Sequence, residues 1–206
     1  MITIVDYGVG NVCSVMNALS FLGVKSELTS NAERIRCADK LILPGVGTFG
    51  FAMARLHRLG LVSVIREAAL KHKIPILGIC LGMHLFAEIG EEQGECEGLG
   101  LIPGRVRHIK NLDSSIKVPH IGFNSITYNR ESNIFMGLNE GKDFYFVHSY
   151  QFETSDLYVV ATVEYSDFYL TAAVESNSIF GLQFHPEKSQ SNGLKILNNF
   201  SRLHLC

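Results

Sequence analysis

The segment Gly78-Ile79-Cys80-Leu81-Gly82 holds a cysteine between two glycines, directly after an apolar run. This spacing is that of a nucleophile elbow, in which the glycines allow a sharp turn from a strand into a helix. A thiol held at such a turn is open to substrate, and the free amide groups at the start of the helix favour its thiolate form. The pattern therefore predicts that Cys80 attacks a carbonyl group, although a lone cysteine is more often a small buried hydrophobic residue.

A histidine and a carboxylate follow another apolar run near the C-terminus. Residues 179–184 are expected to form a strand, and His185 and Glu187 come directly after it. In extended backbone, side chains two residues apart project to the same side, so the carboxylate would fix the tautomer of the imidazole. We expect His185 to carry the proton of Cys80 and Glu187 to orient His185, which completes a Cys-His-Glu triad.

Attack on a carbonyl also needs two N–H donors for the oxyanion that forms. The amide of Leu81 is one candidate, because it directly follows the nucleophile. The segment Pro44-Gly45-Val46-Gly47 follows another apolar run and is the second candidate, since its glycines let a peptide turn toward the site. We expect Gly45, Val46 and Gly47 to supply this donor, although Pro-Gly is also a common turn dipeptide.

The elements that position these residues alternate in type along the first hundred residues. Strands are expected at residues 1–5, 40–43 and 74–79, and helices at 12–22, 51–59, 61–72 and 81–89. Such alternation predicts a parallel sheet with helices on both faces. In the second half, β-rich segments around residue 147 and at 158–164, 169–174 and 179–184 precede a last amphipathic helix at 193–203. We expect one α/β domain over residues 1–206, with a mostly parallel central sheet, flanking helices and additional antiparallel strands in the C-terminal half.

Composition and charge exclude several classes of protein. Of the 206 residues, 47% are hydrophobic and 18% are charged, which is typical of a folded globular chain. The formal net charge of −2 offers no basic footprint, so we expect no nucleic-acid or membrane partner. Asp6 interrupts the first apolar run, which is too short for a signal peptide or a membrane span.

The cysteines indicate a reduced, cytoplasmic protein. Their number is odd, none forms a C-x-x-C pair, and none lies at zinc-ligand spacing from a histidine, so we expect no metal site. Four of them lack the glycine frame of Cys80 and are expected to be ordinary thiols: Cys13, Cys37, Cys96 and Cys206.

Motifs spread over the whole chain resemble those of class I (triad-type) glutamine amidotransferases. They lie, in order, at residues 6–11, 44–47, 78–83, 98–104, 119–122, 145–150 and 183–189. The resemblance implies that Cys80, His185 and Glu187 hydrolyse the side-chain amide of L-glutamine without a cofactor. The chain is most similar to glutaminase subunits that form a heterodimer with a (β/α)₈-barrel cyclase subunit and supply it with ammonia in histidine biosynthesis. In those proteins the segment at 44–47 rearranges when the cyclase binds its nucleotide.

The resemblance also implies further site residues. Six are expected to bind glutamine: Gly82, His84, Glu92, His148, Ser149 and Tyr150. Glu92 would meet the ammonium group of the substrate, and the backbone of residues 148–150 its carboxylate. Phe123 and Lys188 fall at positions that face the partner, although Phe123 would equally suit a core and Lys188 an ordinary solvated surface.

Two positions depart from the family pattern. His84 stands where members usually have a glutamine that supports the substrate, and Phe123 where tryptophan is often found. We expect His84 to be a substituted pocket residue, since imidazole can donate or accept a hydrogen bond. Three alternatives remain: a paralogue that supplies ammonia to amidate a surface-glycan sugar, a self-sufficient cysteine hydrolase, and a binding subunit impaired by His84.

Overall fold

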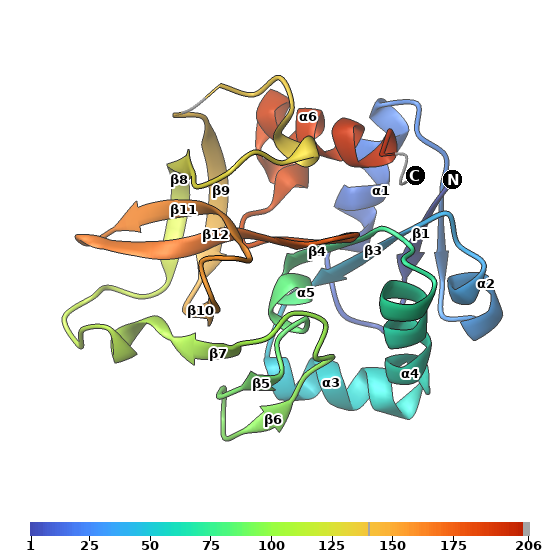
Figure 1. Cartoon of the computed structure of the whole chain (residues 1–206), viewed down its shortest axis with the longest axis horizontal. Coiled ribbons are helices and arrows are strands. Elements are labelled where there is room, and N and C mark those ends of the chain that lie inside the picture. Colours follow the sequence, from blue (N-terminus) through green and yellow to red (C-terminus); the bar gives the residue numbers. More distant parts are fainter. Residues whose placement is uncertain (140, 204–206) are drawn as a thin grey trace.

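The computed structural model describes residues 1–139 and 141–203, through which a nine-stranded sheet runs. The strand order is β2-β1-β3-β4-β13-β12-β11-β8-β9 (Figure 1). The first five strands in this order are paired in parallel: β2 (Ser26–Thr29), β1 (Ile2–Val5), β3 (Lys40–Gly45), β4 (Ile76–Cys80) and β13 (Ile179–Leu182). Cys206 lies outside the described residues.

The other half of the sheet is antiparallel. It comprises β12 (Phe168–Ser176), β11 (Val159–Tyr165), β8 (His120–Tyr128) and β9 (Asp143–His148). The predicted α/β fold, with antiparallel strands added in the C-terminal half, is therefore confirmed. A smaller sheet of order β10-β7-β5-β6 was not predicted; its strands are β10 (Tyr150–Glu153), β7 (Arg105–His108), β5 (Ile89–Gly90) and β6 (Cys96–Glu97).

Helices cover both faces of the large sheet. Figure 1 shows α1 (Val12–Phe21) and α6 (Gln190–Ser201) on one face, and α3 (Phe49–Arg58), α4 (Leu61–Arg66) and α5 (Leu81–His84) on the other. A π-helical turn, η1 (Glu67–Lys71), continues α4, and α2 (Ala32–Arg36) follows β2. Short 3₁₀ turns form at η2 (Ile109–Asn111), η3 (Asn133–Phe135) and η4 (Pro186–Lys188). None of the helices in residues 1–139 and 141–203 is long and apolar enough to cross a membrane.

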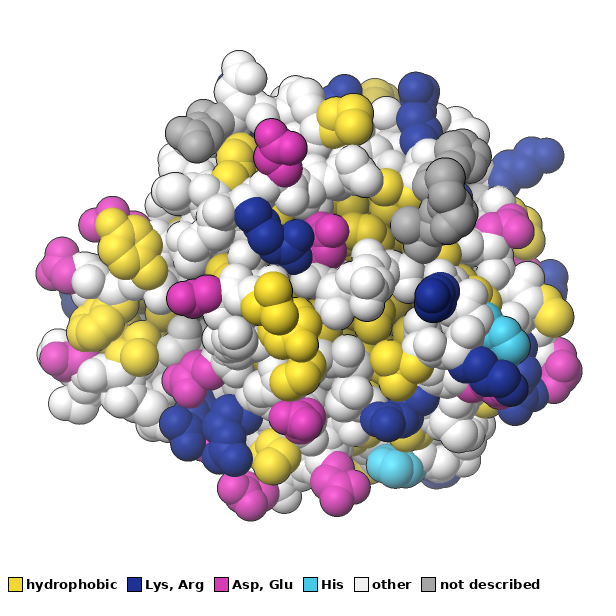
Figure 2. All heavy atoms as spheres, viewed as in Figure 1, with side chains coloured by type: hydrophobic (Ala, Val, Ile, Leu, Met, Phe, Trp, Pro, Cys, Tyr) yellow, Lys and Arg dark blue, Asp and Glu magenta, His cyan; other side chains and the backbone are white. Residues whose placement is uncertain are grey.

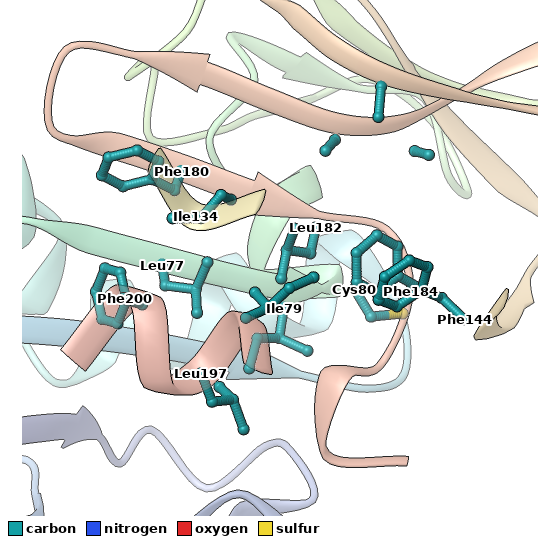
Figure 3. Packing of buried hydrophobic residues seen from close by; sticks show 14 of the residues in the cluster. Leu77, Ile79, Cys80, Ile134, Phe144, Phe180, Leu182, Phe184, Leu197 and Phe200 are labelled. Carbon is teal, nitrogen blue, oxygen red and sulfur yellow. The ribbon is translucent and has the colours of Figure 1, made fainter. Parts of the chain in front are cut away.

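Two cores form because side chains alternate between the faces of each strand. Ile42, Leu77 and Ile79 pack with α1 and α6, whereas Leu41 and Leu43 pack with α3, α4 and α5. Figure 3 shows the first core, which includes Cys80, the last residue of β4. On the face seen in Figure 2, side chains of both charge signs are interspersed.

The helix expected at residues 81–89 is much shorter in the structure. It ends at His84, and the amides of residues 99–101 donate to the carbonyls of Leu85, Phe86 and Ala87 at 2.8–2.9 Å. These three side chains are fully buried. The prediction of a helix over residues 81–89 is therefore wrong beyond His84, because a turn buried on all sides carries the same hydrophobic residues as a buried helix.

Gly82 brings α5 into contact with β3, and this contact generates a prediction. A Cβ atom at this position would lie 1.8 Å from the Leu43 carbonyl oxygen. Gly82→Ala is therefore expected to lower the free energy of unfolding by about 3 kcal/mol or more, measured by urea denaturation.

Gly50→Ala is the matched control for this substitution. Gly50 lies in α3, and apart from its chain neighbours and the backbone of its own helix nothing lies within 4 Å of the position of its Cβ. Alanine has the higher helix propensity, so this variant should gain about 0.5–1 kcal/mol. Equal urea midpoints for the two variants would contradict the assigned contact.

Candidate active site

Cys80 takes a strained backbone conformation at the C-terminal end of β4. Its φ of 53° and ψ of −111° are rarely adopted by a residue with a side chain. A Cβ on Gly78 would lie 2.7 Å from the backbone of Gly82, so both glycines of the elbow are required for the close turn. The turn leaves Cys80 at the edge of the core, with 8% of its surface exposed.

His185 and Glu187 form a buried pair in the turn that follows β13, the strand next to β4. β13 runs parallel to β4, with Leu182 opposite Ile79, and His185 follows three residues after Leu182. The His185 Nδ1 and Glu187 Oε1 atoms are 2.8 Å apart, and the two side chains are 2% and 1% exposed. Nδ1–H therefore donates to the carboxylate, which directs Nε2 away from it.

The backbone that makes this pair differs from the prediction. Residues 185–187 were expected to be extended, but η4 turns the chain as a 3₁₀ helix from Pro186. Proline fits the first position of such a turn because its φ is fixed and it needs no N–H partner. The pairing of the two side chains thus arises from a tight turn and not from strand alternation.

The pKa of His185 is raised to about 9. Burial lowers it, but the interactions with Cys80 and with Glu187 favour the charged ring and outweigh burial. Within the described residues, His185 Nε2 and Glu187 Oε2 have no hydrogen-bond partner that meets ordinary geometry. The site therefore holds an imidazolium at neutral pH with one ring nitrogen available for a reacting group.

Two further groups contact the Cys80 sulfur. The thiol donates to the Val147 carbonyl at 4.0 Å, and the Gln183 amide nitrogen donates to the sulfur at 3.9 Å. Gln183 Oε1 is 2.6 Å from His84 Nε2. Burial lowers the pKa of His84 to about 4, so its ring is neutral at physiological pH.

A cavity of about 410 Å³ opens onto these residues, a size suited to a small molecule. Its wall includes these expected site residues: Val46, Gly47, Cys80, Leu81, His84, Glu92, His148, Ser149, Tyr150 and His185. Gly45 and Gly82 are not part of the wall: Gly45 pairs with Cys80 across the β3–β4 ladder, and Gly82 packs on β3. A larger hollow of about 750 Å³ at residues 128–138 has no cysteine or histidine in its wall.

Two side chains that the sequence analysis left without a role support this cavity. The buried Tyr7 hydroxyl donates to the Pro44 carbonyl at 2.7 Å, directly before the segment expected to form the oxyanion hole. His120 Nδ1 is 3.0 Å from His148 Nε2, and His148 Nδ1 is 2.8 Å from the Tyr150 carbonyl. The carbonyl can only accept, so His148 Nδ1–H donates to it and His120 donates to His148. Burial lowers the pKa of His148 to about 3 and of His120 to about 4, which keeps both rings neutral.

The remaining expected residues lie around the cavity. Glu92 accepts a hydrogen bond from the Phe49 amide at 2.8 Å, which fixes its carboxylate at the start of α3. Phe123 is 52% exposed and meets the edge of Tyr145 with ring centroids 5.5 Å apart, so it is not a core residue. Lys188 places its Nζ 5.5 Å from the centroid of the same tyrosine. No group of three potential metal ligands occurs among residues 1–139 and 141–203.

Comparison with known proteins gives matches over nearly the whole chain. The family model described as glutamine amidotransferase class-I matches residues 3–203. Imidazole glycerol phosphate synthase subunit HisH 1 of Campylobacter jejuni subsp. jejuni serotype O:23/36 (strain 81-176) is 44% identical, covering 98% of this chain and 100% of that protein. Subunit HisH of Aquifex aeolicus (strain VF5) is 47% identical, covering 97% and 95%. PurLQS from Thermotoga maritima shares the fold, with a TM-score of 0.73, 20% identity, and coverage of 97% of this chain and 96% of that one.

The hydrogen bond of Tyr7 predicts a measurable stability effect. Tyr7→Phe removes the donor and leaves the Pro44 carbonyl without it, so the free energy of unfolding should fall by about 1–2 kcal/mol in urea denaturation. Tyr169, which is 68% exposed, provides the control, and Tyr169→Phe should stay within about 0.5 kcal/mol of the parent. A Tyr7→Phe variant as stable as the control would show that the bond contributes nothing.

The raised pKa of His185 predicts its titration. In the folded chain the ring should be charged below about pH 9 and lose its proton as the pH rises through that value, as followed by NMR. Cys80→Ala and Glu187→Gln should each lower the midpoint, because each removes an interaction that favours the charged ring. His148 is the internal reference, since it should stay neutral throughout. A His185 midpoint at or below its ordinary value of 6.5 in the parent chain would refute this assignment.

Proposed function

Because the chain belongs to the class I glutamine amidotransferase family, we propose that it is the glutaminase subunit of an imidazole glycerol phosphate synthase, in histidine biosynthesis. The observation that carries the proposal is the meeting of the strained Cys80 and the His185–Glu187 pair at one cavity. Relatives named as this subunit match the chain over nearly their full length, which supports the same role here.

Cys80 is the nucleophile in the proposed reaction. Its thiolate forms a bond to the side-chain amide carbon of L-glutamine, and the electron pair of the C=O π bond moves to oxygen. The amide of Leu81 and an amide of the segment at 45–47 would donate to this oxyanion, since Leu81, Val46 and Gly47 lie on the cavity wall. Donors aimed at charge that exists only in the transition state lower the barrier.

His185 moves the protons. Its ring carries a proton at neutral pH because its pKa is about 9, so it can protonate the leaving nitrogen as the C–N bond breaks and ammonia departs. The neutral ring then takes a proton from the water that attacks the thioester, and the C–S bond breaks to release glutamate and the thiolate. Glu187 holds the ring in position and offsets its charge throughout.

Polar groups on the cavity wall suit the other end of glutamine. The Glu92 carboxylate, fixed by the Phe49 amide, would meet the ammonium group, and the backbone of residues 148–150 the carboxylate. His84 supports the pocket from α5 in place of the glutamine that the family usually has there. We assign Gly82 to the packing of α5 on β3 and not to contact with substrate.

We propose that the surface beside the cavity binds a partner protein, a (β/α)₈-barrel cyclase subunit. Ile121 and Phe123 on β8 are 61% and 52% exposed, and Tyr145 and Lys188 adjoin them. The Tyr145 carbonyl accepts a hydrogen bond from the His185 amide at 2.9 Å, so this surface is joined to the catalytic turn. Direct transfer to a partner keeps ammonia unprotonated and therefore nucleophilic.

We also propose a cytoplasmic location. Cys13, Cys37, Cys80 and Cys96 are all free thiols, which is the state that a reducing compartment maintains. An exposed thiol such as Cys13 would be prone to oxidation elsewhere.

The decisive experiment measures glutamate and ammonia from the chain together with its barrel partner and the cyclase nucleotide. Cys80→Ala should reduce release to below about one thousandth of the parent rate, because it removes the nucleophile. Cys13→Ala is the matched control; this exposed cysteine lies on α1, and its loss should leave the rate unchanged.

The same assay separates the alternatives. Equal rates with and without the partner would indicate a self-sufficient cysteine hydrolase. No release in either case would indicate an impaired binding subunit. Release without formation of the cyclase product would favour the surface-sugar paralogue, and full activity of Cys80→Ala would exclude the assigned nucleophile.

A further inference from the structure

Gln183 is a fully buried polar side chain that contacts the sulfur of Cys80. Its exposed fraction is 0%, and its backbone amide donates to Ala172 on β12 at 2.9 Å. At the end of the side chain, the amide nitrogen lies 3.9 Å from the Cys80 sulfur and the oxygen lies 2.6 Å from His84 Nε2. Both ends of this amide therefore contact residues of the site.

The orientation of the amide follows from its two neighbours. A thiolate has no proton to give, so only the NH₂ end of Gln183 can satisfy it. The oxygen must then face His84, and since this oxygen only accepts, His84 carries its proton on Nε2. His84 is thus neutral, and its Nε2–H donates to the Gln183 oxygen.

We propose that Gln183 donates a hydrogen bond that stabilises the Cys80 thiolate, and that His84 is the positioning residue that holds the Gln183 amide in this orientation. The proposal rests on the proposed function only in taking Cys80 as the nucleophile. It gives the histidine that replaces the usual family glutamine a second task besides lining the pocket. It also makes Gln183 part of the site, although this residue, directly after β13, is fully buried and not on the cavity wall.

Other titratable groups also act on the sulfur. His185 approaches from the turn after β13, and Tyr7 from the end of β1. His148 on β9 is close enough to His84 and His185 that a charge on either ring would lower its pKa. Gln183→Met places no new charge beside these three groups, so it measures the effect of the amide separately.

The test is the pH dependence of Cys80 alkylation by iodoacetamide in the full-length chain, measured by mass spectrometry of the Cys80 peptide. Gln183→Glu keeps the acceptor for His84 but replaces the N–H donor with a carboxylate, and should raise the midpoint by about one pH unit. Gln183→Met removes the donor without adding charge, and should raise it by about half a unit.

His84 is tested by a matched pair of substitutions. His84→Gln keeps an N–H donor and should leave the midpoint of Cys80 within about 0.2 units of the parent, whereas His84→Met frees the Gln183 amide and should raise it by about half a unit. The exposed Cys13 is the internal reference in every sample, and circular dichroism checks that each variant is folded.

Unchanged midpoints in both Gln183 variants would overturn the proposed hydrogen bond. Equal midpoints in His84→Gln and His84→Met would overturn the positioning role. If one Gln183 variant does not fold, the other decides. The readout needs neither glutamine nor the partner, so these failures differ from failure of the proposed function, in which Cys80 would show the expected shifts while the complex releases no glutamate.

Discussion

The approach of Gly82 to the Leu43 carbonyl is the contact on which the arrangement of the site depends. Without a Cβ, the first turn of α5 lies directly on β3, which places Cys80 at the end of β4 with its sulfur over the cavity. Gly45 lies against Leu81 and Gly82 at the same place, and Val46, Gly47 and Leu81 share one cavity wall with Cys80. The proposed nucleophile and the proposed oxyanion donors are thus positioned by backbone packing, which is stiffer than the packing of long side chains.

The local part of this site could be predicted from the sequence. The glycine frame of Cys80 and the position of His185 after an apolar strand are signals carried by a few adjacent residues. The predicted local structure was wrong where tertiary packing decides the backbone conformation. The helix expected at residues 81–89 ends after one turn, and residues 185–187 turn into a 3₁₀ helix instead of staying extended. A fully buried turn and a buried helix have the same apolar residues, so periodicity cannot separate them.

The contacts between distant elements of the site had no local sequence signal, although His120 and Gln183 stand within the motifs at residues 119–122 and 183–189. His120 meets His148 only because β8 pairs with β9 in the register that sets them opposite each other. Gln183 reaches Cys80 only because β13 lies beside β4, although 103 residues separate the two in the chain. Strand order and register are set by the whole fold, and one residue of slip would turn either side chain to the opposite face.

The backbone of Cys80 has a consequence for how this position can evolve. A φ of 53° costs free energy in any residue with a Cβ, and glycine alone adopts it without penalty. The thiol thus stands at a position where loss of the side chain would relieve backbone strain. Selection for robustness and selection for chemistry oppose each other at this codon, and a lineage released from the second would be expected to drift toward glycine.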